Sequence, residues 1–215
     1  GSEMCIRDRF WMDQARAIDW VTPPSYALNA KNAPLYEWFT DAQVNTCYNA
    51  VDRHVKNGRG DQIAIIYDSP ITGKKGTTSF ADLQLQTASL AGALLQQGIV
   101  SGDRVIIYMP MVPQALVAML ACARIGAVHS VVFGGFAAHE LAVRIDDATP
   151  KAIIAASCGV EPGRVIAYKP LLEGAIDQAT HKPNFTIILQ RDEGPCDLIA
   201  GYDYDWNVVQ EGASP

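Results

Sequence analysis

From Gln62 onward, short apolar runs rich in β-branched residues alternate with longer amphipathic segments. This alternation is typical of α/β units, in which each strand is followed by a helix that packs back onto the sheet. Because the runs are almost continuously apolar, they predict strands that are covered on both faces. The predicted strands are 63–67, 105–108, 128–133, 152–156 and 186–189. Right-handed crossovers between them would give a mostly parallel sheet flanked by helices, so the predicted fold class is α/β.

Four amphipathic segments predict helices, at 80–97, 113–124, 138–147 and 170–180. The first has the clearest limits. Ser79 and Asp82 have the spacing of a capping box, and Gly98 can adopt the left-handed conformation that ends a helix.

The composition limits which kinds of partner molecule are expected. The chain has 17 Lys and Arg against 23 Asp and Glu, a net charge of −6, with no dense basic cluster. Nucleic acids and anionic membrane surfaces require a concentrated positive field, so neither is expected as a partner. The uncharged stretch between Arg104 and Arg124 is long enough to be considered as a membrane-spanning segment. Pro110 and Pro113 divide it, however, into a strand, a turn and a helix. Five cysteines without a C-x-x-C pair indicate reduced thiols, a cytoplasmic location and no zinc site.

The pattern divides the chain into three parts. Residues 1–9 have no apolar core of signal-peptide length and are interpreted as a non-native lead. Residues 10–54 form an N-terminal cap of helical pieces and proline-containing extended chain, with three of the four tryptophans. Large aromatic side chains on so little regular structure usually anchor a segment against another domain. Residues 55–215 are the α/β part.

Ligands of such sheets gather beyond the carboxyl ends of the strands. A predicted strand ends at Phe133 and is followed by Gly134 and Gly135, and paired glycines let a ligand approach the backbone closely. The alternative is a simple turn, because neither G-x-G-x-x-G nor G-x-x-x-x-G-K-[ST] occurs in the chain.

The segment 157–164 also follows a predicted strand and ends in Glu161-Pro162-Gly163-Arg164. A guanidinium in such a loop can bind phosphate through paired hydrogen bonds. The alternative is a surface ion pair of Arg164 with Glu161 or Asp146. The four histidines are isolated, and no residues combine into a catalytic set, so no catalytic residue and no metal ligand is predicted.

Longer strings are more specific than these loops. They are W-F at 38–39, N-T-C-Y-N-A-V-D-R-H at 45–54, G-D-R-V at 102–105, Y-M-P-M at 108–111, L-A-C-A-R-I-G-A at 120–127 and H-S-V-V-F-G-G-F at 129–136. In this order, over about residues 10–191, the chain resembles AMP-forming acetyl-CoA and propionyl-CoA synthetases. The strings Y-D-S-P at 67–70 and E-P-G-R at 161–164 resemble the propionate-type branch most.

The resemblance implies a ligase that uses ATP with Mg²⁺, a short-chain carboxylate and CoA. It implies that Glu161, Pro162, Gly163 and Arg164 contact the 3′-phosphate and ribose of CoA, and that Phe133, Gly134 and Gly135 form the floor beneath the adenine. Acetate-type relatives carry an arginine where this chain has Glu161, and a carboxylate there would repel the phosphate.

The family's phosphate loop, of the form T-S-G-T-T-G-x-P-K-G, does not occur in the 215 residues. The chain is therefore interpreted as the N-terminal part of a synthetase, inactive alone and without a tightly bound cofactor. Acetate and propionate remain open as substrates, as does the oligomeric state. The alternative is a stand-alone, non-catalytic α/β domain that binds a nucleotide or CoA. A nicotinamide oxidoreductase is disfavoured because the dinucleotide fingerprint is absent.

Overall fold

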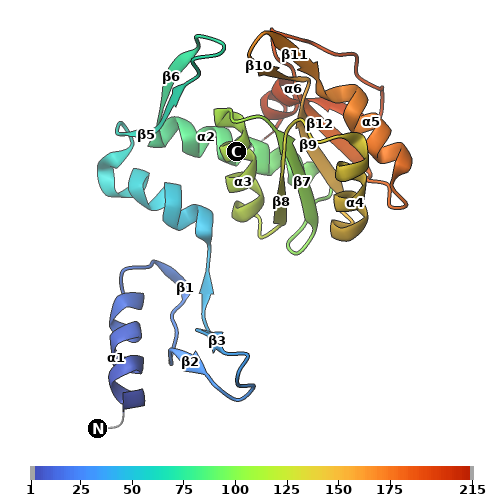
Figure 1. Cartoon of the computed structure of the whole chain (residues 1–215). Coiled ribbons are helices and arrows are strands. Elements are labelled where there is room, and N and C mark those ends of the chain that lie inside the picture. Colours follow the sequence, from blue (N-terminus) through green and yellow to red (C-terminus); the bar gives the residue numbers. More distant parts are fainter. Residues whose placement is uncertain (1–2, 214–215) are drawn as a thin grey trace.

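A five-stranded sheet forms the centre of the computed structural model, which describes residues 3–213 (Figure 1). The strand order is β13-β12-β9-β7-β8, and every neighbouring pair is parallel. The bounds are β7 Arg104–Met109, β8 Val128–Phe133, β9 Ala152–Ala156, β12 Phe185–Leu189 and β13 Asp203–Asp205. The predicted α/β class with a mostly parallel sheet is thus confirmed.

Two groups of helices flank the sheet. In one group α2 packs against α3 and α6, and in the other α4 packs against α5 (Figure 1). Right-handed crossovers from β7 through α3 and from β9 through α5 run in opposite directions along the sheet, which assigns the groups to opposite faces. The bounds are α2 Phe80–Gln96, α3 Pro113–Arg124, α4 Ala138–Ala148, α5 Tyr168–Gln178 and α6 Trp206–Glu211.

The central strands and α2, the first of the predicted helices, agree closely with the prediction. All residues of β9 and β12 are buried, as are five of the six in β7. At the start of α2 the Ser79 hydroxyl accepts a hydrogen bond from the Asp82 amide at 3.1 Å, and beyond its end Gly98 has φ +81°. The capping signals in the sequence therefore predicted both ends of this helix correctly.

The prediction that all five apolar runs are covered on both faces was wrong for two of them. β5 (Ile63–Asp68) pairs antiparallel with β6 (Lys75–Ser79) in a separate hairpin, where Ile66 is 78% exposed. The connection between them is a short turn, which permits only antiparallel pairing. β8 is an edge strand of the main sheet, and Phe133 at its end is 66% exposed.

A second hairpin lies where the sequence predicted only a loop. β10 (Cys158–Glu161) and β11 (Arg164–Ala167) pair antiparallel, with Glu161 opposite Arg164. Pro162 and Gly163 form the turn, in which Gly163 has φ +77°. The hairpin connects β9 to α5 and projects beyond the carboxyl edge of the sheet (Figure 1).

The N-terminal cap extends away from the sheet (Figure 1). It consists of α1 Glu3–Ala15, the pair β1 Trp20–Thr22 with β4 Gln43–Val44, and the pair β2 Leu28–Asn29 with β3 Glu37–Trp38. A π-helical turn, Tyr48–Asp52, and a second helical segment, Val55–Arg59, which is kinked at Asn57 and Gly58, lead to β5. Residues 3–9 of the expected lead belong to α1, whereas residues 1 and 2 lie outside the described residues.

The aromatic side chains of the cap pack on one another. Trp11 and Trp38 meet with ring centroids 5.4 Å apart, and Trp20 and Phe39 at 5.6 Å. Within the described residues the tryptophans thus pack inside the cap, and their anchoring of this segment against another domain stays a prediction. Contacts between the cap and the α/β part include the side-chain amide of Asn45, which donates to the backbone oxygen of Arg124 at 2.9 Å, and an ion pair of Asp52 with Arg124 at 2.7 Å. Among residues 3–213, no helix is long and apolar enough to cross a bilayer.

Candidate functional site

A cavity of about 550 Å³ lies between the turns of the two hairpins. The β5–β6 turn contributes Pro70 and Ile71, and the β10–β11 turn contributes residues 160–165. Its volume is in the usual range for small-molecule sites. Four predicted site residues line it together: Glu161, Pro162, Gly163 and Arg164.

Arg164 is engaged in an ion pair across its own hairpin. Its Nε and Nη2 atoms donate to the same carboxylate oxygen of Glu161, at 2.8 and 2.6 Å. The two side chains are 68% and 45% exposed. The surface pairing with Glu161 that the sequence left open as an alternative is thus present. Exposed pairs of this kind contribute only about 0–1 kcal/mol, so a ligand with a stronger negative charge can replace the carboxylate.

The other predicted segment is a tightly packed turn. A Cβ atom on Gly134 would lie 2.6 Å from the ring of Tyr168 and 2.8 Å from the backbone of Met109, so only glycine fits there. Gly135 has φ +103°, and its amide donates to the hydroxyl of Tyr108 at 3.2 Å. These contacts give the paired glycines a structural reason. Phe133, Gly134 and Gly135 do not line the 550 Å³ cavity.

Tyr168 connects the two predicted segments. A Cβ atom on Gly159 in β10 would lie 2.2 Å from its hydroxyl, so the ring sits against both Gly134 and Gly159. Its ring centroid is 5.1 Å from that of Tyr108, and burial raises the pKa of Tyr168 to about 12. The sequence reasoning missed both tyrosines. The signal for them was indirect: glycines that recur after strands imply a large side chain packed over them.

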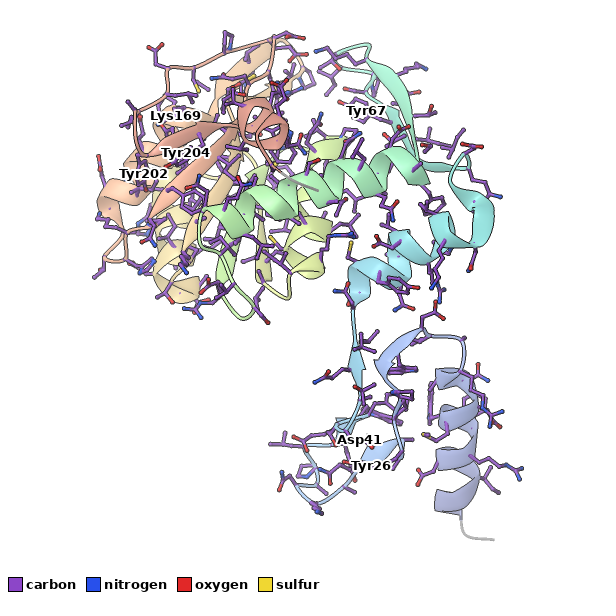
Figure 2. The ribbon with its side chains drawn as sticks, turned by 180° about the vertical axis from the view of Figure 1, so that it is seen from behind. Tyr26, Asp41, Tyr67, Lys169, Tyr202 and Tyr204 are labelled. Carbon is purple, nitrogen blue, oxygen red and sulfur yellow. The ribbon has the colours of Figure 1, made fainter. Side chains whose placement is uncertain are left out.

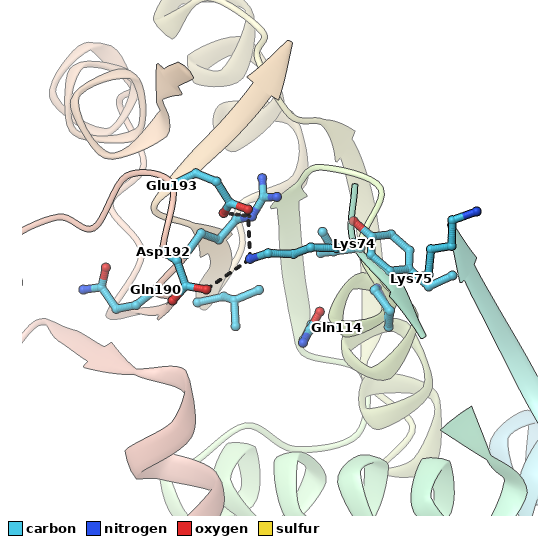
Figure 3. Close-up of a pocket in the computed structure, with 11 residues that line it drawn as sticks. Lys74, Lys75, Gln114, Gln190, Asp192 and Glu193 are labelled. Atoms are coloured by element: carbon cyan, nitrogen blue, oxygen red, sulfur yellow. Dashed lines mark hydrogen bonds and ion pairs between the residues drawn. The ribbon is translucent and has the colours of Figure 1, made fainter. Parts of the chain in front are cut away.

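A second cavity, of about 440 Å³, is shown in Figure 3. Lys74 from the β5–β6 turn reaches across it to Asp192 at 3.1 Å and Glu193 at 2.9 Å, in the loop after β12. Lys75 pairs with Asp68 at 2.8 Å within the hairpin. Arg191, which also lines this cavity, lies 3.6 Å from the Glu193 carboxylate. The cations of the cavity are therefore already paired with carboxylates, which makes it a poorer anion site than its size suggests.

A buried ion pair lies away from both cavities. Lys169 on α5, labelled in Figure 2, is 5% exposed and approaches Asp203 on β13 and Glu173 at 2.7 Å each. Burial alone would lower the pKa of Lys169, but hydrogen bonds to Asp203 and Glu173 outweigh it and raise that pKa. Asp203 also accepts from the backbone amide of Ile199 at 2.7 Å. Because every charge is partnered, the cluster holds α5 against β13 rather than offering a reactive group.

The four cysteines whose side chains the structure describes are poor nucleophiles. Cys47, Cys122 and Cys158 are buried, and Cys196 is half-buried. Burial raises the pKa of each thiol, to about 12 for Cys122. Few of these thiols are ionised at neutral pH. Within residues 3–213, no group of three or more His, Cys, Asp or Glu side chains is placed to hold a metal ion.

Two family models match the chain. The model described as acetyl-coenzyme A synthetase N-terminus matches residues 6–50, and the model described as AMP-binding enzyme matches residues 51–208. The second match covers most of the chain. The chain belongs to the AMP-binding enzyme family. The resemblance drawn from the sequence strings is thereby confirmed.

Relatives of this chain include a rat mitochondrial acyl-CoA synthetase short-chain family member 3, 50% identical over 200 residues. The alignment covers 93% of this chain and 29% of the rat protein. Propionate–CoA ligase of Escherichia coli is 42% identical over 199 residues, which cover 93% of this chain and 32% of the ligase. The chain thus spans about a third of the length of these curated relatives.

A solved structure of acetoacetyl-CoA synthetase from Streptomyces lividans has the same fold. It superposes with a TM-score of 0.85 at 24% sequence identity, over 98% of this chain and 32% of that one. At this identity the likeness concerns the fold alone.

Proposed function

We propose that this chain forms the CoA-facing part of an AMP-forming short-chain acyl-CoA synthetase. The observation that carries the proposal is the cavity between the hairpin turns, where Arg164 and Glu161 are the charged side chains among the described lining residues and the others are apolar or glycine. The sequence resemblance assigns the same residues to the 3′-phosphate and ribose of CoA. The relatives that match most of this chain are named as acyl-CoA synthetases and ligases.

The reaction of the whole protein follows from this assignment. A carboxylate oxygen of the short-chain acid attacks the α-phosphorus of ATP, and the bond to the β-phosphate oxygen breaks to release pyrophosphate. The CoA thiolate then attacks the acyl carbon, and the bond to AMP breaks to give the thioester. Mg²⁺ enters with ATP as part of the substrate. The proposed role of residues 55–215 is to bind and orient CoA for the second step.

Glu161 tunes the phosphate contact. In the structure it accepts both hydrogen bonds from Arg164, so an incoming phosphate competes for the same donors. Two unit charges about 4 Å apart interact by about 1 kcal/mol in water and about 4 kcal/mol at an effective dielectric constant of about 20. Glu161 therefore weakens 3′-phosphate binding in this pocket, whereas Arg164 is required for it.

Calorimetric titration with CoA and with 3′-dephospho-CoA tests the proposal. The chain is expected to bind CoA more tightly, and Arg164→Ala to remove that preference. Glu161→Gln keeps the shape of the side chain and is expected to increase the preference by about fivefold, as expected for roughly 1 kcal/mol of relieved repulsion. Equal binding of the two ligands by the unmodified chain would contradict a 3′-phosphate site.

The second candidate is a non-catalytic nucleotide-binding domain, which the pairing of Arg164 with Glu161 and the packing role of Gly134 keep open. Release of pyrophosphate that depends on acetate or propionate separates the two. We expect none from these 215 residues alone and turnover from a synthetase that contains them. The cytoplasmic location expected from the sequence stays a prediction, since the rat relative is named as mitochondrial.

A further inference from the structure

The turn of the β5–β6 hairpin presents an apolar tip to the cavity. The Ser69 amide donates to the backbone oxygen of Lys74 at 2.9 Å, which closes a turn over residues 69–74. Gly73 supplies the positive φ of +67° that the turn requires. Ile71 at the tip is 50% exposed and lines the cavity, opposite the turn that carries Arg164. Val165, also 50% exposed, lies on the other wall, so the cavity has an apolar surface on both sides.

The loop after β12, residues 190–194, holds both hairpins. Its Asp192 and Glu193 bind Lys74 of the β5–β6 hairpin (Figure 3). Its Arg191 donates to the backbone oxygen of Cys158 in β10 at 3.0 Å. A Cβ atom on Gly194 would lie 3.1 Å from the side chain of Cys158, so the loop also packs tightly against the β10–β11 hairpin. A single loop thus sets the distance between the two walls of the cavity.

We propose that the β5–β6 hairpin is the second wall of the CoA nucleotide pocket, with Ile71 contacting the adenosine end of CoA and Lys74 positioning the hairpin through Asp192 and Glu193. This inference rests on the proposed function. The adenosine end combines a flat apolar base with a 3′-phosphate. This matches a cavity with Ile71 on one turn and Val165 with the Arg164 guanidinium on the other. Ile71 is a binding residue in this arrangement, whereas Lys74 acts only through the position of the turn.

The test measures the affinity of the chain for CoA and for 3′-dephospho-CoA in four variants. Ile71→Ser and Lys74→Glu are each expected to lower the affinity for both ligands alike, by about fivefold. The first removes the apolar side chain from the wall, and the second displaces the turn that carries it. Lys74→Arg is expected to retain binding, since it can still pair with the two carboxylates. Lys75→Glu is the matched control: it makes the same charge change at the next residue, whose partner Asp68 lies in the hairpin itself.

The pattern across ligands distinguishes this inference from the proposed function. If Ile71→Ser leaves both affinities unchanged, or Lys74→Glu behaves as Lys75→Glu, the hairpin is not a positioned wall, while loss of the CoA preference in Arg164→Ala would still support the phosphate site. If the unmodified chain binds neither CoA nor 3′-dephospho-CoA, both this inference and the proposed function are wrong. Thermal unfolding of each variant checks that the fold is retained, which we expect because the side chains of Ile71 and Lys74 are each about half exposed.

Discussion

The central strands of the sheet and the two hairpins at its carboxyl edge differ in burial and in the kind of side chain they carry. β9 and β12 are entirely buried and largely aliphatic, whereas more than half of the residues of β5–β6 are exposed, as are three of the four in β11. In β10, Cys158 and Gly159 are buried and the other two residues are half-buried. The charged groups that line the cavities belong to the hairpins and to the loop after β12. We infer that the strands determine stability and the hairpins determine binding, so substitutions in the two regions should separate these properties.

The largest effect is expected at the buried pair that fastens β13 to α5. Lys169→Met leaves Asp203, whose side chain is 0% exposed, without its cationic partner. Loss of one member of a buried pair costs about 3–5 kcal/mol. Urea unfolding followed by circular dichroism measures the change, with Lys75→Met at the exposed Asp68 pair as the control, expected to cost at most about 1 kcal/mol. Equal losses in the two variants would show that burial does not distinguish these pairs.

A somewhat smaller effect is expected from a cavity in the central sheet. Ile154→Ala removes aliphatic volume from β9 at a residue that is 0% exposed, which costs about 2–5 kcal/mol of unfolding free energy. Ile66→Ala makes the same change on β5, where the residue is 78% exposed, and is expected to cost no more than about 0.5 kcal/mol. Neither variant should change the ratio of CoA to 3′-dephospho-CoA affinity. A changed ratio of the two affinities in Ile154→Ala would show that the central strands also determine binding.

The same difference explains what could be predicted from the sequence. The strand 152–156 and the start of α2 at Ser79 were recognised because local signals, an apolar run and a capping box, determine them. The exposed strand 63–68 was misplaced because its apolar residues resemble those of a buried strand, and the turn to β6 decides its pairing. Local composition reports how apolar a segment is, but not which neighbour covers it.

The candidate site was predictable only where its chemistry is local. Arg164 was found because it is the one cation in a Gly/Pro-containing segment after a strand. The role of Lys74 could not be found in this way, because its contact with Asp192 joins residues 118 apart in the chain. Tyr168 was missed for the same reason, since Gly134 meets it only in the folded structure. Side chains that act by holding one segment against another carry no signal in the spacing of either segment.

The smallest expected effect is on the pH dependence of the melting temperature, and it concerns the contact that holds the β5–β6 hairpin. The hydrogen bond from Lys74 holds the pKa of Glu193 below its usual value, against the opposing effect of burial, and Arg191 lies on the other side of the same carboxylate. A carboxyl group with a lowered pKa stabilises the folded state above its unfolded pKa, and this contribution is lost as the pH falls through the lowered value. The Tm of the chain should therefore exceed that of Lys74→Gln at pH 7, and the difference should shrink below about pH 4. Lys75→Gln removes the same charge without touching Glu193 and corrects for the change in net charge. A difference between the chain and Lys74→Gln that persists undiminished at about pH 3 would show that the contact with Glu193 does not hold the hairpin.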